Sequence, residues 1–317
     1  MIRRKFCLIT ISIFALLISS FGIAQAGWPE RPVKFILGSQ PGSSIDSIGR
    51  ILAKLLSEKF GQPFVAMNIT GGALGAFPMT MKNSKNDGYV IGMGADMNFS
   101  YTGLEKTADF NFDDFDYLCS IFKGDCSFIC SGTREWTNIK DALEDVKAQS
   151  RPLIYLFQTS KDRLMMQEYA KQVGAQINCV PSRGPSSIIS SLLGGHSDAG
   201  FSGGVHYPQA KAGKIKTLTM TTSNRSSNYP DVPTASELFD PSYVMDALRI
   251  IVAPKGFPEE ARTECLKAIS EVITTDEFKA FVNNMHFVID YHEGEDLQRI
   301  LDRQVIENKK MLGDAAK

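Results

Sequence analysis

The stretch from residue 33 to residue 56 constrains the fold most, because a polar turn there joins a short apolar strand to an amphipathic helix. Residues 33–37 read as the strand, and the small, polar or turn-forming residues at 38–44 require the chain to reverse direction. Such a turn leaves backbone N–H groups unpaired at the helix N-terminus, and these groups attract anions. The helix is marked by apolar residues at helical spacing, namely Ile45, Ile48, Leu52, Leu55 and Leu56.

This loop has two interpretations. In the first, its N–H groups bind a carboxylate. In the second, it is an ordinary strand-to-helix turn that Ser43 or Ser44 caps, with Asp46 in the first helical turn. The loop residues alone favour the ordinary turn.

The first 26 residues carry the pattern of a secretory signal peptide. Three basic residues at positions 3–5 precede an apolar segment over 6–18, and Ala24-Gln25-Ala26 is a small-x-small cleavage site. The apolar segment is short for a transmembrane helix, and no later stretch is apolar for long enough to span a bilayer. We therefore expect cleavage after Ala26 and a soluble chain that begins at Gly27 and works in the periplasm.

Charge and cysteine content narrow the function further. Without residues 1–26 the chain has 31 basic and 35 acidic residues, a charge of −4, which indicates neither a nucleic-acid partner nor an acidic one. An odd number of cysteines follows the predicted cleavage site, so at least one thiol stays free in an oxidising compartment. A disulfide among the first three, around an expected hairpin at Lys123-Gly124, stays an open alternative. The cysteines are Cys119, Cys126, Cys130, Cys179 and Cys265.

The order of the expected elements indicates an α/β fold. Residues 33–93 alternate strand, helix, strand, helix, strand, and a small-residue loop follows each strand. A second α/β unit begins near residue 153, and the 317-residue length favours two domains. In doubly wound α/β sheets, ligands bind beyond the carboxyl ends of the strands.

One catalytic pattern is present. Gly200-Phe201-Ser202-Gly203-Gly204 fits the G-x-S-x-G nucleophile elbow. The pattern is short, and glycine and serine are common in this sequence, so the alternative is a strand-end loop in which Ser202 bonds a ligand or the backbone. The acids and histidines that follow the motif include Asp231, Asp246, His286 and His292.

Other site patterns are missing from the sequence. The histidines show no metal-binding spacing, and residues 71–75 do not form the dinucleotide motif G-x-G-x-x-G. We therefore expect no metal and no cofactor. Loops rich in N–H donors and hydroxyl groups suit binding without chemistry.

Nine ordered stretches together resemble one protein family, although each of them is weak alone. They are residues 28–33, 40–46, 56–65, 86–89, 180–184, 192–198 and 212–218, Arg225 with 230–234, and residues 253–256. In order and spacing they are similar to the extracytoplasmic substrate-binding receptors of tripartite tricarboxylate transporters, also called Bug-type or TctC-like receptors. The resemblance extends from Trp28 to the C-terminal helix.

This resemblance implies a two-lobed periplasmic binding protein fold of type II-like form. Each lobe would be a doubly wound α/β sheet, and a cleft between them would close on a small carboxylated ligand. Lobe I would comprise residues 27–130 and 223–317, and lobe II residues 131–222. In the family the opening loop grips a carboxylate through backbone amides, and a loop of the second lobe, here residues 157–163, faces it.

The sequence departs from the family pattern at these loops. Residues 157–163 replace a loop that is usually rich in serine and glycine, and Met165 stands at a histidine position. Ser43 replaces the second glycine of the opening loop, and residues 72–76 do not keep the family's glycines. Asp96 occurs where small neutral residues are common. Lys161 could therefore pair with a second carboxylate and Asp96 with an amine, or both could be solvent-facing charges outside the cleft.

We therefore expect a monomeric receptor for a di- or tricarboxylate, an amino acid or an aromatic acid, with a tripartite tricarboxylate-type membrane permease as its partner and no enzymatic activity. The alternatives are a periplasmic ligand sensor for a signalling kinase, a serine hydrolase that uses Ser202, and a non-binding structural descendant of the receptor fold. The predicted ligand-binding residues are Ser39, Gln40, Gly42, Ser43, Ser44, Asp46, Gly71, Gly72, Asp96, Thr159, Ser160, Lys161 and Ser202.

Overall fold

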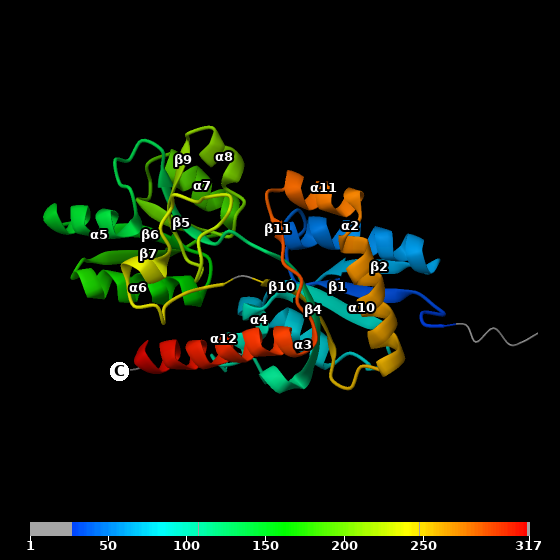
Figure 1. The fold of residues 1–317 in the computed structure, drawn as a ribbon. Helices are drawn as coiled ribbons and strands as arrows, with labels where there is room; N and C mark the ends of the chain where they lie inside the picture. The colour runs from blue at the N-terminus through cyan, green and yellow to red at the C-terminus, as the bar shows by residue number, and fades with distance from the viewer. Residues whose placement is uncertain (1–26, 107, 247, 316–317) are drawn as a thin grey trace, which may run out of the picture.

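The computed structural model describes residues 27–106, 108–246 and 248–315. The predicted signal peptide at residues 1–26 lies outside this part of the chain. The described residues form two α/β lobes side by side, and the long C-terminal helix α12 (Gly294–Ala315) runs along both (Figure 1). This two-sheet architecture confirms the fold class expected from the sequence. No helix in the described ranges is long and apolar enough to cross a membrane.

The first lobe is built on a six-stranded sheet. Its strands are β1 (Val33–Leu37), β2 (Phe64–Asn68), β3 (Val90–Ala95), β4 (Phe115–Lys123), β10 (Leu248–Pro254) and β11 (Val288–Ile289). They lie in the order β11-β4-β10-β3-β1-β2. β1 is parallel to β2 and β3, whereas β10 is antiparallel to β3 and β4. The helical segments of this lobe are α2 (Ser44–Phe60), η1 (Gly72–Leu74), α3 (Ala76–Lys82), α4 (Met97–Ser100), η2 (Phe112–Asp114), α10 (Glu259–Ile273) and α11 (Asp276–Asn284).

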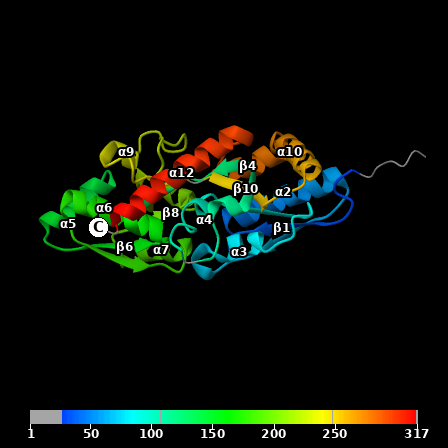
Figure 2. The ribbon, with the colours of Figure 1, turned by 90° about the horizontal axis from the view of Figure 1, so that it is seen from below.

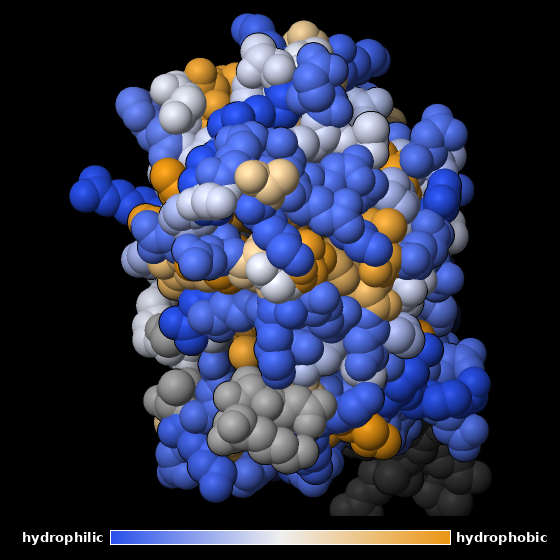
Figure 3. Space-filling view, turned by 90° about the vertical axis from the view of Figure 1, so that its left-hand side faces the viewer, coloured by the Kyte–Doolittle hydropathy of each residue, from blue (hydrophilic) through white to orange (hydrophobic). Residues whose placement is uncertain are grey.

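The second lobe is built on a five-stranded sheet. Its strands are β5 (Ser127–Ser131), β6 (Leu153–Phe157), β7 (Ile177–Pro181), β8 (Ala199–Ser202) and β9 (Ile215–Met220), in the order β7-β6-β8-β5-β9. Its helices are α5 (Ile139–Ala148), α6 (Ser160–Val173), α7 (Pro185–Leu193) and α8 (Tyr207–Lys211), and α9 (Ala235–Leu238) lies in the connection back to β10. The end face of this lobe is mainly hydrophilic, with hydrophobic residues in separate groups (Figure 3).

The prediction of a hairpin at Lys123-Gly124 is wrong. β4 pairs with β10 and β11, while β5 pairs with β8 and β9, so the two strands belong to different sheets. Each strand already has neighbours on both sides, so neither has a free edge for the other. The chain instead crosses between the lobes at residues 124–126, and the lobe boundary drawn at residue 130 falls inside β5.

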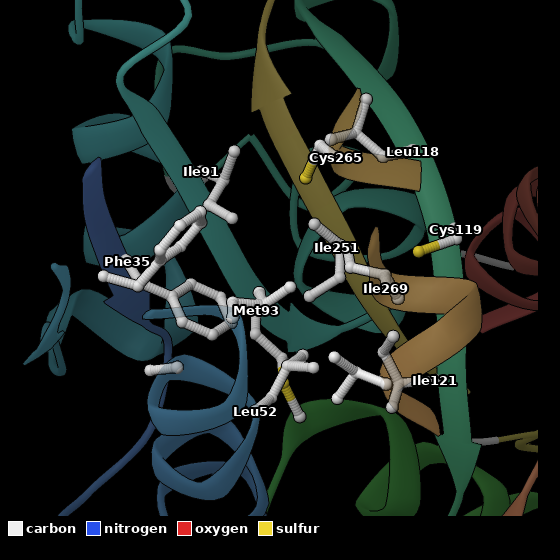
Figure 4. Packing of buried hydrophobic residues seen from close by; sticks show 14 of the residues in the cluster. Phe35, Leu52, Ile91, Met93, Leu118, Cys119, Ile121, Ile251, Cys265 and Ile269 are labelled. Carbon is white, nitrogen blue, oxygen red and sulfur yellow. The ribbon is translucent and has the colours of Figure 1, made fainter. Parts of the chain in front are cut away.

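Local signals in the sequence account for the first helix. Ser43 caps the N-terminus of α2, and Gly61 ends the helix with φ +66°, a left-handed conformation that favours glycine. The apolar face of α2 packs on the sheet, where Leu52 meets strand residues such as Phe35 and Met93 (Figure 4). Cys265 and Ile269 of α10 belong to the same core.

The five described cysteines are all free thiols. Cys119 and Cys265 belong to the core of the first lobe, whereas Cys126 and Cys130 belong to the core of the second. A disulfide between Cys119 and either of the other two early cysteines would have to join separate cores. Cys126 and Cys130 share a core but are also free thiols, so the alternative of a disulfide among these three does not hold.

Strand directions place two sets of loops opposite each other. β10 enters the first sheet from the second lobe and runs antiparallel to β3, so the carboxyl ends of β3 and of its parallel partners β1 and β2 face the second lobe. β5 leaves the crossing antiparallel to β8, so the carboxyl ends of β8, β6 and β7 face the first lobe. The loops after β1 and β2, and the loops after β6 and β7, therefore lie at strand ends that point toward the other lobe.

α12 joins the two lobes along one side (Figures 1 and 2). Leu297 and Leu301 pack into the first lobe on the face that also carries α3. Near the other end of the helix, Met311 belongs to the hydrophobic core of the second lobe. The C-terminal part of the chain thus contacts both halves of the molecule.

Candidate ligand-binding site between the lobes

The loop between β1 and α2 lies at the surface and has a defined internal structure. Gln40 and Gly42 are exposed, and Ser39 and Ser43 are partly exposed. The Ser43 hydroxyl donates to Ser39 Oγ at 2.7 Å and accepts the Asp46 N–H at 3.2 Å. The loop therefore faces solvent rather than lying beneath other side chains, as a binding loop must.

Asp46 supports this loop from inside the protein. It is 6% exposed, and its carboxylate accepts the Gly42 N–H, Arg50 Nε and Asn68 Nδ2, each at 2.8 Å. Burial alone would raise the pKa of Asp46, but these hydrogen bonds outweigh burial and lower it below its usual value. Asp46 thus stays ionised and fixes the loop conformation.

Two N–H groups of the first turn of α2 have no acceptor. Within the described ranges, the N–H groups of Ser44 and Ile45 bond to no other part of the chain. This follows from their positions, since the first turn of a helix has no preceding carbonyls to bond. Together with the partial positive charge of a helix N-terminus, they make this end of α2 suitable for binding a carboxylate.

The loop between β6 and α6 is built in the same way. Thr159 caps α6, accepting the Asp162 N–H at 3.2 Å, and Asp162 in turn accepts the Thr159 N–H at 2.6 Å. Burial raises the pKa of Asp162 to about 6, although hydrogen bonds from Thr159 and Tyr155 partly offset this. Thr159 and Ser160 are partly exposed. Asp162 is not among the predicted ligand-binding residues. The sequence feature that could have indicated its role is the spacing Thr159-x-x-Asp162, which repeats the spacing Ser43-x-x-Asp46.

Gly71 and Gly72 lie in the exposed loop that follows β2. Their φ angles are +105° and +58°, a region that favours glycine, so the side-chain-free backbone is needed here. The loop is anchored to the first lobe where Asn98 Nδ2 donates to the Leu74 carbonyl at 3.3 Å. Because β1 and β2 are parallel, this loop lies at the same end of the strands as the loop between β1 and α2.

Asp96 and Lys161 are both buried, so the alternative that they are solvent-facing charges outside the cleft is wrong for both. Asp96 is 1% exposed and accepts Gln304 Nε2 of α12 at 2.8 Å, while Lys161 is 5% exposed and donates to Asn308 Oδ1 of α12 at 2.7 Å. Burial raises the pKa of Asp96 and lowers that of Lys161. Residues of α12 thus bond both side chains, and no local sequence feature indicates these contacts.

Ser202 forms a buried chain of hydrogen bonds with a histidine that the sequence analysis missed. Ser202 Oγ lies 2.8 Å from His206 Nδ1, and His206 Nε2 lies 2.8 Å from Thr217 Oγ1. Ser202 is 2% exposed and His206 is fully buried, which lowers the pKa of the imidazole to about 4. The spacing of four residues between Ser202 and His206 is the sequence feature that could have indicated this hydrogen bond.

This geometry suits a structural network better than a nucleophile. The second imidazole nitrogen meets hydroxyl groups of Thr217 and Tyr229, at 2.8 and 3.2 Å, where a catalytic triad would place a carboxylate. Neither Ser202 nor His206 reaches solvent. In addition, no cluster of His, Cys, Asp and Glu able to hold a metal ion occurs among the residues that the structure describes.

Solved structures resemble this one over almost its whole length. The R. palustris protein Rpa4515, solved with adipate, gives a TM-score of 0.74 at 22% identity, covering 91% of this chain and 98% of that one. MatC (Rpa3494) from Rhodopseudomonas palustris, solved with bound malate, gives a TM-score of 0.74 at 16% identity, covering 90% and 99%. At these identities the likeness establishes the shared fold.

Sequence comparison adds the family. Protein BugT of Bordetella pertussis is 28% identical over 263 residues, which cover 78% of each chain. The model of the tripartite tricarboxylate transporter family receptor matches residues 48–316. The match includes most of α2, the loops after β2 and β6, and α12, and it confirms the resemblance inferred from the ordered sequence stretches. The chain therefore belongs to the tripartite tricarboxylate transporter receptor family, a family of solute-binding receptors.

Proposed function

We propose that the chain is a periplasmic receptor that binds a small dicarboxylate between its lobes and delivers it to a tripartite tricarboxylate-type membrane permease. The observation that carries the proposal is the pair of helix N-termini, those of α2 and α6. They begin at loops on facing strand ends of two different sheets. In this proposal the lobes are the two sheets with their helices, and the first crossing between them lies at residues 124–126.

Two facing helix N-termini match the charge pattern of a dicarboxylate. Each N-terminus offers free N–H donors and a partial positive charge, so one can hold each carboxylate. Asp46 and Asp162 already hold their loops in place through backbone N–H groups. Because the loops are ordered before the ligand arrives, little conformational entropy is lost on binding.

The predicted site residues then divide into two groups. Those that contact the ligand are Ser39, Gln40, Gly42, Ser43, Ser44, Thr159 and Ser160, with Gly71 and Gly72 at the border. Asp46, Asp96, Lys161 and Ser202 are buried and position the loops from behind. The adipate and malate named for two structural neighbours are both dicarboxylates, which supports the same ligand class here.

Isothermal titration of the mature chain against matched pairs of acids tests the proposal. Adipate and hexanoate share a carbon chain and differ in one carboxylate. If both helix N-termini bind, adipate or a shorter dicarboxylate should bind at least about tenfold more tightly than the matching monocarboxylate, because one charge-assisted hydrogen-bonded group is lost. Equal affinities within each pair, or no binding of any di- or tricarboxylate, would contradict the proposal.

A further inference from the structure

A cavity of about 280 Å³ lies where the two lobes join. We call it the hinge pocket. It is lined by Lys123, Asp125, Asp246, Asp290, Arg303 and Gln304, together with Thr222 and residues 224–226 of the return crossing, the connection from β9 back to β10. It lies beside β11 and the end of β9, which are edge strands of the two sheets. The predicted ligand loops follow strands near the opposite edges, β2 and β7, and none of the thirteen predicted ligand-binding residues lines this pocket.

Gln304 presents a buried acceptor that has no partner in the described part of the chain. The residue is 5% exposed, and its Nε2 donates to Asp96 Oδ2 at 2.8 Å. Asp96 also accepts the N–H groups of Met97 and Leu248, so the amide must turn its NH₂ group toward this carboxylate. Gln304 Oε1 is therefore left without a donor, which is unfavourable for a buried polar atom unless a bound group supplies one.

Two cations of the pocket retain free donor capacity. Lys123 Nζ is 3.6 Å from Asp290, and the closest approach of Arg303 to Asp246 is 4.0 Å, so both ion pairs are longer than hydrogen bonds. Arg303 also lies 3.8 Å from Glu307, again beyond hydrogen-bond distance. These donors can still bind a carboxylate.

The remaining charges make the lining balanced. Arg225 is already used, since it bonds both carboxylate oxygens of Glu237, at 2.9 and 2.8 Å. Together with Lys123 and Arg303 it gives the lining three positive side chains, beside the three acids Asp125, Asp246 and Asp290 and the imidazole of His292, which lies 3.3 Å from Asp290. A lining of this kind favours a ligand that carries both charges and no net charge, rather than an anion.

We propose that the hinge pocket binds a free amino acid in its zwitterionic form. The carboxylate bonds Arg303 and Lys123, and the ammonium group donates to Gln304 Oε1 and lies beside Asp246. This site is separate from the dicarboxylate site. Its ligand would contact both crossings and α12, the segments that join the lobes.

Titration of the mature full chain with the individual amino acids tests this inference, with Arg303→Gln as the main variant. Arg303 is exposed, with 58% of its side chain accessible, so its replacement should leave the fold intact. Arg299→Gln is the matched control, because Arg299 is one turn away on the same helix and does not line the pocket. Ser44→Pro, which removes an N–H donor of the first turn of α2, reports on the predicted dicarboxylate site.

The expected result is that at least one amino acid binds at millimolar concentration or below. Its affinity should fall by about tenfold or more in Arg303→Gln, and should be unchanged in Arg299→Gln and in Ser44→Pro. Binding that Ser44→Pro weakens and Arg303→Gln does not would place the amino acid at the α2 loop and overturn the inference. So would the absence of binding by every amino acid, or equal binding of the matching α-hydroxy acids. All of these outcomes are affinities for amino acids, so they remain interpretable even if the protein binds no dicarboxylate.

Discussion

Replacing Ser44 with proline removes one backbone N–H from the proposed dicarboxylate site while keeping the helix. Ser44 is the first residue of α2, a position that proline favours because its φ suits the helix and the lost N–H has no partner in the helix. The preceding residue must be extended, and Ser43 already is, with φ −75° and ψ 168°. The variant should therefore fold with an unchanged melting temperature.

The expected loss follows from the bond that disappears. A hydrogen bond to a charged group contributes about 1.5–3 kcal/mol, so the Kd for the best dicarboxylate should rise about 10- to 100-fold in Ser44→Pro. Ser44→Ala removes the hydroxyl and keeps the N–H, so its Kd should stay within about threefold of the parent. Isothermal titration of the three proteins measures these differences. A folded Ser44→Pro protein with the parent's Kd would refute the role of the α2 N-terminus.

Four further predictions test the rest of the structure. Ser160→Pro should weaken dicarboxylate binding by about tenfold or more at the α6 N-terminus, and Ser160→Ala should not, by the same titration. Lys161→Met should change the melting temperature but leave the dicarboxylate Kd nearly unchanged, because Lys161 Nζ bonds Asn308 and not the ligand; a large rise in Kd would show direct contact. Burial lowers the pKa of His206 from 6.5 to about 4, so between these pH values the folded state binds fewer protons than the unfolded state. The free energy of unfolding should therefore fall as the pH drops from 6.5 to about 4, and denaturant unfolding of His206→Gln should show a smaller fall. Mass spectrometry of the exported protein should give an N-terminus at Gly27, and an intact residue 1–26 segment would contradict the predicted signal peptide.

The features that depend on neighbouring residues could be predicted from the sequence. The apolar strand at 33–37, the Ser43 cap and the glycine that ends α2 all act within a few positions, so the β1–α2 loop was located correctly. The alternation of strands and helices was enough to predict two α/β lobes. The crossing at residues 124–126 was mistaken for a hairpin, because a short turn between two strands looks the same whether or not they pair.

Features that depend on distant residues could not be predicted. Asp96 bonds Gln304, 208 positions away, and Lys161 bonds Asn308, 147 positions away. Nothing near Asp96 or Lys161 signals that a C-terminal helix covers them, so both were considered as ligand contacts or surface charges. His206 was closer, four residues after Ser202, but only the structure shows that the strand end turns the two side chains toward each other.

The position of α12 at the end of the chain sets the order in which the molecule can be completed. If the protein is exported N-terminus first, as the proposed signal peptide requires, both sheets can emerge before the residues that bond Asp96 and Lys161. Until the last segment has crossed the inner membrane, these two charges have neither their amide partners nor the helix that shields them from water. If export proceeds in this way, the chain would gain the two α12 contacts, and the stability that they supply, only after translocation ends.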